Sequence, residues 1–307
     1  LHEGILARGH ISRLHVTEGK TWPRTPGLKP LYPRVLAKLD HSRASSLIPK
    51  IASRHIWTDR AFRNLATADS DLIHLHSYHG LYASLDSFAY LSKTKPLVWT
   101  FHGSWGMTGG CDHPFDCTRY QTGCGQCPQI GRFAVGPVDR TAEEWHSTLG
   151  HRWKLHVIPN GVDPHLFSGQ RKQDPHFRHT LKLSPDRIIA LCICRDFKEP
   201  SKGFSLLQKV LSSQAWPGLQ VVLIGGNSTW ARSRLPYTLE VVDQGYVRDR
   251  TQLAAFCEAS DLFLYASDGE NFPCVILEAM ASECCVVSSP VDGVTEQIKN
   301  NVSGLVS

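Results

Sequence analysis

The sequence contains no apolar run of about 20 residues, the length that a membrane-spanning helix requires. It does not open with the charged-then-apolar segment of a secretory signal, and it has no internal repeats or low-complexity stretches. These absences argue against membrane-spanning, secreted and repeat proteins, and we expect a soluble cytoplasmic protein. With 307 residues, of which 41% are hydrophobic, the chain can form two ordinary cores, so two domains are expected.

Charge is unevenly distributed along the chain. The formal net charge is +5, and residues 1–65 hold 12 basic residues against 4 acidic ones, a surplus of 8. This stretch favours either an anionic partner, such as a membrane surface, or simply a solvated basic face. We do not expect nucleic acid as a partner, because the basic residues are scattered among Pro and Leu and accompany no known binding motif.

Short apolar runs alternate with amphipathic segments through most of the chain. The spacing predicts helices at residues 205–214 and 251–259. The runs typical of buried strands are residues 71–76, 96–101, 187–193, 219–224, 262–265 and 284–288. Such alternation predicts an α/β protein with parallel sheets and right-handed crossovers. Ligands in these folds bind beyond the C-terminal ends of the strands.

Two glutamates stand eight positions apart, on either side of Pro273. Because proline is favoured at a helix start, the sequence predicts a helix that begins near Pro273. Glu270 then lies in the loop before the helix, and Glu278 lies about one turn into it. Exposed amides at a helix start attract a diphosphate, and flanking carboxylates accept hydrogen bonds from sugar hydroxyl groups. The pattern therefore favours a phosphorylated sugar as the ligand.

Arg195 and Lys202 flank the loop that follows the strand expected at residues 187–193. Two fixed cations at this position can neutralise a diphosphate leaving group as charge develops on it. Either residue alone is more typical of a surface cation, and Lys198 is an alternative to Arg195.

The paired glutamates and their surroundings resemble the Glu-x7-Glu motif of retaining glycosyltransferases of family 4, which have the GT-B fold. The sequence of these segments is most similar to that of bacterial polysaccharide glycosyltransferases of the colanic-acid type. Further similar segments are residues 157–163 (Val-Ile-Pro-Asn-Gly-Val-Asp), 202–204, 245–247, 288–296 and 100–103 (Thr-Phe-His-Gly), together with the cysteine-rich passage after the last of these.

The resemblance implies two Rossmann-like domains whose parallel sheets face an interdomain cleft. We expect an acceptor-binding domain at residues 1–160, with a Cys-rich insert at 111–127, and a nucleotide-sugar-binding domain at 161–307. The implied activity is sugar transfer, with retained anomeric configuration, from a nucleoside diphosphate sugar to a hydroxyl group of a glycan or lipid-linked acceptor in polysaccharide biosynthesis. An enzyme with a lipid-linked acceptor would work in the cytoplasm at the inner face of the membrane, in peripheral contact with anionic lipids.

The resemblance also assigns roles to residues. His102, one of 16 histidines, contacts the donor sugar, and Glu270 positions that sugar and stabilises charge, so these two are the expected catalytic residues. No cofactor is required for the chemistry, because a donor phosphate oxygen takes the acceptor proton and fixed cations replace a divalent metal.

The resemblance implies a larger set of donor-binding residues. By this resemblance, Lys202 is expected to neutralise the diphosphate, Glu278 to bind the ribose hydroxyl groups, and the backbone of Val247 to contact the base. Asn271-Phe272-Pro273 replaces the commoner Gly-Phe-Gly, and its amides face the pyrophosphate although Pro273 has no N–H. The full expected set is Arg195, Lys202, Val247, Asn271, Phe272, Pro273 and Glu278.

Four of the ten cysteines fall within seventeen residues: Cys111, Cys117, Cys124 and Cys127. Their number, and the Cys-x2-Cys pair that encloses Gly125, are typical of a structural zinc site with four ligands. The first pair has a wider spacing than usual, so free thiols remain an alternative. Disulfides are less expected in a reducing cytoplasm. Other cysteines, such as Cys192 and Cys284, lie in apolar runs and are typical of small core residues.

Two other functions remain open at this stage. A GT-B phosphorylase or epimerase would share the diphosphate site, and a non-catalytic nucleotide-sugar-binding or zinc-ribbon module would use the same residues without turnover. The chain begins without Met, and we expect that segments are missing from it, including a strand near residues 139–150.

Overall fold

The computed structural model describes residues 8, 14–16, 28–30, 56–76, 85–111, 113–130, 157–172, 174 and 176–307. The chain divides into two compact units, Leu1–Trp153 and Lys154–Ser307, and each is described by itself. Residues 139–150, where the sequence suggests a missing strand, lie outside the described residues, as does most of the basic stretch 1–65.

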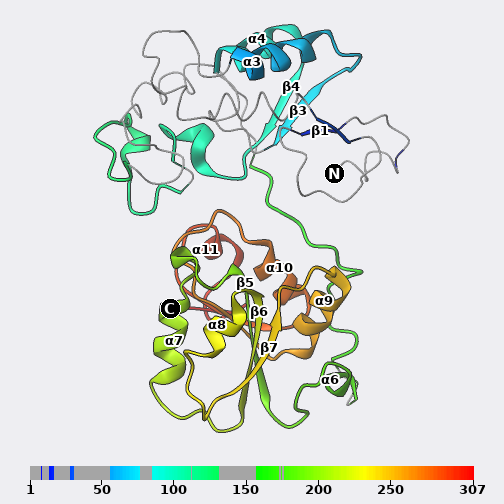
Figure 1. Cartoon of the computed structure of the whole chain (residues 1–307), viewed down its shortest axis with the longest axis vertical. Helices are drawn as coiled ribbons and strands as arrows, with labels where there is room; N and C mark the ends of the chain where they lie inside the picture. Colours follow the sequence, from blue (N-terminus) through cyan, green and yellow to red (C-terminus); the bar gives the residue numbers. More distant parts are fainter. Residues whose placement is uncertain are drawn as a thin grey trace. The chain divides into compact units, whose positions relative to one another are not determined.

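The first unit contains two pairs of parallel strands. In one pair, β1 (Leu14–Val16) lies beside β2 (Leu28–Pro30), and in the other, β3 (Ile73–His76) lies beside β4 (Leu97–Thr100). Two helices among the described residues of this unit, α3 (Ile56–Asn64) and α4 (Leu85–Thr94), lie near β3 and β4 (Figure 1). Their common core comprises Phe62, Ile73, Leu75, Phe88 and Leu91. The strands predicted at residues 71–76 and 96–101 are confirmed.

The second unit is built around a six-stranded parallel sheet with the order β10-β9-β8-β5-β6-β7. This is the strand order of a doubly wound dinucleotide-binding fold. The strands are β5 (Ile188–Asp196), β6 (Leu219–Gly226), β7 (Glu240–Gly245), β8 (Leu262–Tyr265), β9 (Cys285–Ser288) and β10 (Leu305–Val306). The predicted α/β class with parallel sheets is confirmed.

Helices cover both faces of this sheet (Figure 1), and each face has its own core, because successive strand residues point to opposite sides. The helices are α6 (Phe177–Thr180), α7 (Phe204–Ser212), α8 (Ser228–Arg232), α9 (Arg250–Ala259), α10 (Cys274–Ala281) and α11 (Val294–Gln297). On one face, Ala190 and Val221 pack with α7 and α8. On the other face, Ile189 and Val222 pack with α6, α9, α10 and α11.

The strand order reverses at β5: β6 and β7 are added on one side of it, and β8, β9 and β10 are added on the other side, so β5 and β8 are direct neighbours. At such a switch point the loops after the two strands diverge and leave room for a ligand at the C-terminal ends. The loop after β5 contains a short 3-10 turn, Pro200–Lys202, and the loop after β8 leads to α10. These loops carry Lys202 and Glu270, respectively.

Candidate active site

The loops that follow β5 and β8 are joined by backbone contacts. The Ser201 carbonyl accepts hydrogen bonds from the Asp268 amide and the Ser267 hydroxyl, each at 2.9 Å. Gly203 adopts a φ of +68°, and a Cβ atom at this position would lie 1.6 Å from the Ala266 carbonyl oxygen. Only glycine allows this close approach, which explains why Gly203 follows Lys202.

Lys202 and Glu270 form an ion pair, with 2.8 Å between Lys202 Nζ and Glu270 Oε1. Both side chains are largely buried, at 20% and 13% exposure. The Tyr265 hydroxyl (2.6 Å) donates to the same oxygen, Oε1, and the Ser267 hydroxyl (2.7 Å) shares its one proton between Oε1 and the Ser201 carbonyl. All three of these donors reach Oε1.

The contacts around Glu270 keep it ionised at neutral pH. Burial by itself raises its pKa, but hydrogen bonds from Lys202, Tyr265 and Ser267 outweigh burial and hold the pKa below its ordinary value. Burial and the Glu270 carboxylate raise the pKa of Tyr265, so its hydroxyl stays protonated and donates. The site therefore presents a fixed cation beside a fixed carboxylate.

Glu278 lies on α10, the helix that Pro273 precedes as N-cap residue. It is 4% exposed, and its Oε1 accepts a hydrogen bond of 2.9 Å from the Arg250 guanidinium at the start of α9. Arg250 also lies over the Phe167 ring, with its central carbon 5.2 Å from the ring centroid. The predicted helix start and the positions of both glutamates relative to it are confirmed.

Asn271, Phe272 and Pro273 lead from Glu270 into α10. The Asn160 side-chain amide donates to the Phe272 carbonyl at 3.0 Å, so the turn at residues 157–163 supports this segment. Gly293 adopts a φ of +72°, and a Cβ atom there would lie 1.6 Å from the Asn271 carbonyl oxygen. The segment is thus held on two sides. It leads directly into the first turn of α10, where backbone donors lack partners within the helix.

In the structure Arg195 pairs with a residue of its own loop. Its guanidinium binds Glu199, four residues on, at 2.6 Å, and the side chain is 75% exposed. The alternative cation, Lys198, lies near the Trp230 ring, with Nζ 5.8 Å from the centroid. Val247 lies after β7 and packs against the hydrophobic core.

In the first unit, His102 lies just beyond the C-terminal end of β4 and bonds to a second histidine. His76 Nδ1 is 2.9 Å from His102 Nε2, and His74 Nε2 is 2.8 Å from Thr100 Oγ1. The register of β3 and β4 pairs His76 with Thr100, which brings the rings together. Burial, followed by neighbouring imidazoles, lowers the pKa of His74 and of His76.

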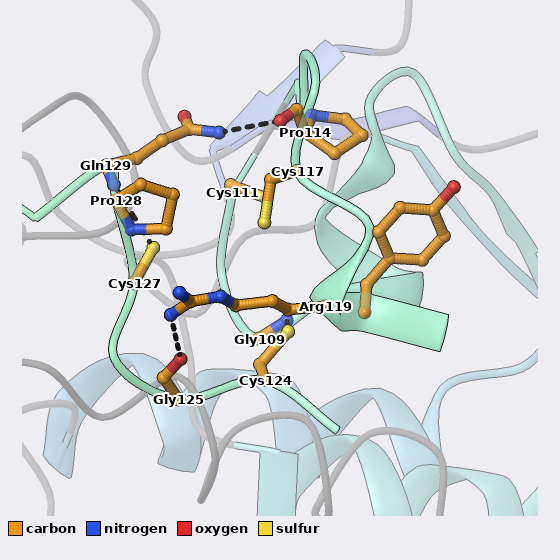
Figure 2. A pocket seen from close by; sticks show the side chains of 11 residues that line it. Gly109, Cys111, Pro114, Cys117, Arg119, Cys124, Gly125, Cys127, Pro128 and Gln129 are labelled. Atoms are coloured by element: carbon orange, nitrogen blue, oxygen red, sulfur yellow. Dashed lines mark hydrogen bonds between the residues drawn. The ribbon is translucent and has the colours of Figure 1, made fainter. Parts of the chain in front are cut away.

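The four clustered cysteines line one pocket in the loop after β4 (Figure 2). Cys111 is buried, whereas Cys117, Cys124 and Cys127 are partly exposed. Burial, opposed by a hydrogen bond with Thr108, raises the pKa of the Cys111 thiol. Among the described residues, no three His, Cys, Asp or Glu side chains form a ready-made metal site.

Four contact residues were not identified from the sequence: Tyr265, Ser267, Arg250 and His76. Tyr265 and His76 are the last residues of β8 and β3, and Ser267 follows two positions after β8. The rule that ligands bind beyond strand ends could have identified these three. Arg250 gave no such signal, because its contact with Glu278 depends on the packing of α9 beside α10.

Comparisons with known proteins agree with this architecture. A model of Glycosyltransferase Family 4 matches residues 6–166, and a model of Glycosyl transferases group 1 matches residues 187–307. A glycosyltransferase from Rickettsia africae has a TM-score of 0.62 at 16% identity, over 99% of this chain and 78% of that chain. Anabaena HepE, solved with UDP and glucose, has a TM-score of 0.54 at 19% identity, over 81% and 67%.

Curated relatives are similarly distant. The putative colanic acid biosynthesis glycosyl transferase WcaC of Escherichia coli is 22% identical over the whole chain and 82% of WcaC. The phosphatidyl-myo-inositol mannosyltransferase of Mycobacterium tuberculosis is 27% identical over 78% of this chain, which spans 60% of that relative.

The fold is of the GT-B type. The chain belongs to glycosyltransferase family 4, and its relatives act in polysaccharide or glycolipid biosynthesis. Among the described residues, none of the helices combines the length and apolar character needed to cross a membrane.

Proposed function

We propose that the protein is a retaining glycosyltransferase that moves a hexose-type sugar from a nucleoside diphosphate sugar to a hydroxyl group of a glycan or lipid-linked acceptor. The Lys202–Glu270 pair at the switch point of the second unit carries the proposal. A fixed cation beside the start of α10 suits a diphosphate, and a fixed carboxylate suits the hydroxyl groups of the transferred sugar.

The environment of Glu270 supports a role in positioning the sugar. Its Oε1 is already held by Lys202, Tyr265 and Ser267, so the carboxylate does not need to rearrange when a donor binds. Oε2 then accepts a hydrogen bond from a sugar hydroxyl group. Preorganised polar groups of this kind stabilise charge without the cost of reorientation during the reaction.

Glu278 and the α10 start complete the proposed donor site. Glu278 accepts hydrogen bonds from the ribose, and Arg250 holds its carboxylate in place. The amides of Asn271, Phe272 and the first turn of α10 face the pyrophosphate. Val247 contacts the base through its backbone, and Arg195 joins the diphosphate site only when it leaves Glu199.

In the proposed reaction, the bond between the anomeric carbon and the diphosphate breaks, and the acceptor oxygen bonds to the same face of that carbon. The acceptor proton passes to a donor phosphate oxygen, so the chemistry needs no side-chain nucleophile. Lys202 and the α10 start offset the negative charge that develops on the leaving diphosphate. His102 contacts the donor sugar.

HepE, which is similar in fold, was solved with UDP-glucose, and this supports a nucleotide sugar as the donor.

The acceptor is proposed from the relatives and the charge distribution. WcaC is named for colanic acid biosynthesis, and the mycobacterial relative is named for transfer to phosphatidyl-myo-inositol. A glycan or lipid-linked acceptor fits both names. The basic surplus of residues 1–65 would favour peripheral contact with an anionic membrane at its cytoplasmic face.

A thermal-shift panel of UDP-, GDP-, ADP- and TDP-sugars tests donor binding. A donor at about a hundred times its dissociation constant should stabilise the folded chain by about 2.7 kcal/mol. We expect Lys202→Ala to abolish most of this shift and to lower kcat/KM by about 100-fold, because it removes the fixed cation. Lys209→Ala, which removes an exposed lysine on α7, serves as the matched control and should behave like the wild type.

The proposal would be contradicted if no nucleotide sugar in the panel stabilised the wild-type chain, or if wild type and Lys202→Ala bound the donor equally well.

Turnover assays with and without inorganic phosphate separate a transferase from a phosphorylase. Glu270→Gln should bind donor but lose most turnover, whereas a purely binding module would show no turnover to lose.

A further inference from the structure

Among the described residues 102–130, the loop after β4 has no hydrophobic core of its own. Its regular structure in the described residues is limited to two short 3-10 turns, Ser104–Met107 and Arg119–Gln121. None of the described residues 102–130 belongs to any of the hydrophobic clusters found among the described residues. Segments that lack a core of this kind usually depend on a cross-link or a bound metal for their stability.

The same loop contains four cysteines. Cys111, Cys117, Cys124 and Cys127 all line one pocket, and Figure 2 shows their side chains around it. In the structure, none of these four cysteines is part of a disulfide. Sulfur ligands in this number are typical of a closed, tetrahedral structural zinc site.

The backbone around Cys124 and Cys127 directs N–H groups at sulfur atoms. The Gly109 amide donates to Cys124 Sγ at 3.2 Å, and the Gln129 amide donates to Cys127 Sγ at 3.4 Å. N–H groups directed at sulfur are the kind of surrounding contact that orients metal-ligating side chains. Between the two cysteines, Gln126 adopts a φ of +49°, which is rare for a residue with a side chain.

Charge in the pocket fits a set of thiolates. Arg119 supplies a cation to the lining, and the lining residues include no carboxylate. The Arg119 guanidinium also donates to the carbonyl oxygens of Gly125 (3.0 Å) and Gln126, which fixes the turn of the Cys-x2-Cys pair. Four thiolates around Zn²⁺ carry a net charge of −2, and Arg119 offsets part of it.

We propose that Cys111, Cys117, Cys124 and Cys127 bind one structural zinc ion. Each thiol releases its proton to solvent on binding, and no oxidation or reduction takes place. The protein fills all four ligand positions, so the ion has no open position for substrate. The ion fixes the loop that begins directly after His102. No ready-made group of three ligands exists among the described side chains, so zinc draws the thiols together from their places around the pocket.

The test measures zinc in the full chain, purified without chelator and dialysed against a weak chelator. We expect about one zinc ion per chain. Cobalt substitution should give the thiolate-to-cobalt charge-transfer band and the intense visible bands of tetrahedral Co²⁺. Cys124→Ser and Cys127→Ser should each lose most of the zinc. Cys285→Ser, which removes an exposed cysteine outside the cluster, should keep it.

Several results would overturn the proposal. One is a wild-type chain without zinc that also fails to bind added Zn²⁺ or Co²⁺. A second is mass-spectrometric evidence that the four cysteines form disulfides in the chain isolated without reductant. A third is equal loss of zinc in Cys285→Ser and Cys124→Ser. The wild-type measurements remain decisive if a serine variant fails to fold, and they are independent of donor binding.

Discussion

The contact between Lys202 and Glu270 depends on neighbouring residues that take no part in the proposed reaction. Gly203 permits the close approach to Ala266, and Ser201 ties the two loops through its carbonyl group. The motif in the sequence indicated that Lys202 and Glu270 share a site, and the structure places them 2.8 Å apart. Their roles in binding and turnover stay predictions.

Sequence reasoning did not anticipate several local contacts. Arg195 was expected to help bind the diphosphate; in the structure its guanidinium binds Glu199, four positions away, and its role in donor binding stays a prediction. The contact of His76 with His102 was also missed, because a single histidine at a strand end is a weak signal. Only the register of β3 with β4 brings the two rings together.

The histidine cluster predicts a pH-dependent stability. The folded-state pKa of His74 and of His76 lies below the ordinary value of about 6.5, so the unfolded chain binds more protons as the pH falls through that value. The free energy of unfolding should therefore decrease from about pH 7.5 to about pH 5.5. His76→Gln should show a smaller decrease in Tm over this range, because glutamine does not titrate.

His179→Gln is the matched control, since His179 is an exposed histidine of the second unit. It should retain the wild-type pH dependence. Identical pH profiles for wild type and His76→Gln would show that the cluster does not contribute.

At the scale of elements, apolar strands were the most predictable features. The strands expected at residues 187–193, 219–224, 262–265 and 284–288 correspond to β5, β6, β8 and β9. β7 was not predicted, because its sequence Glu-Val-Val-Asp-Gln-Gly is half polar. It lies at the edge of the sheet, where burial is only partial. The two-residue β10 is too short to give a periodic signal.

The α9 cap gives a prediction about a single element. The Asp249 carboxylate accepts a hydrogen bond of 2.8 Å from the Thr251 amide and caps the helix. Asp249→Ala should lower the free energy of unfolding by about 1 kcal/mol, because it leaves this amide without its partner. Asp249→Asn should stay close to wild type, since asparagine caps helices equally well. Urea unfolding measures both variants, and equal losses in the two would rule out the capping role.

At the scale of the whole molecule, the sequence predicted the fold class and the family, and both are confirmed. The reason is that α/β alternation and the spaced motifs extend over most of the chain. The division of labour between an acceptor-binding and a donor-binding domain stays a prediction. Donor sugar, base and acceptor depend on side chains that these motifs do not specify.

The central claim is that the second unit binds a nucleoside diphosphate at the switch point between β5 and β8. A crystal structure of the chain with the nucleoside diphosphate that the panel selects tests it most directly. We predict that Lys202 Nζ and the first amides of α10 contact the diphosphate, and that Glu278 contacts the ribose hydroxyl groups. A diphosphate bound away from Lys202 and α10 would contradict the account.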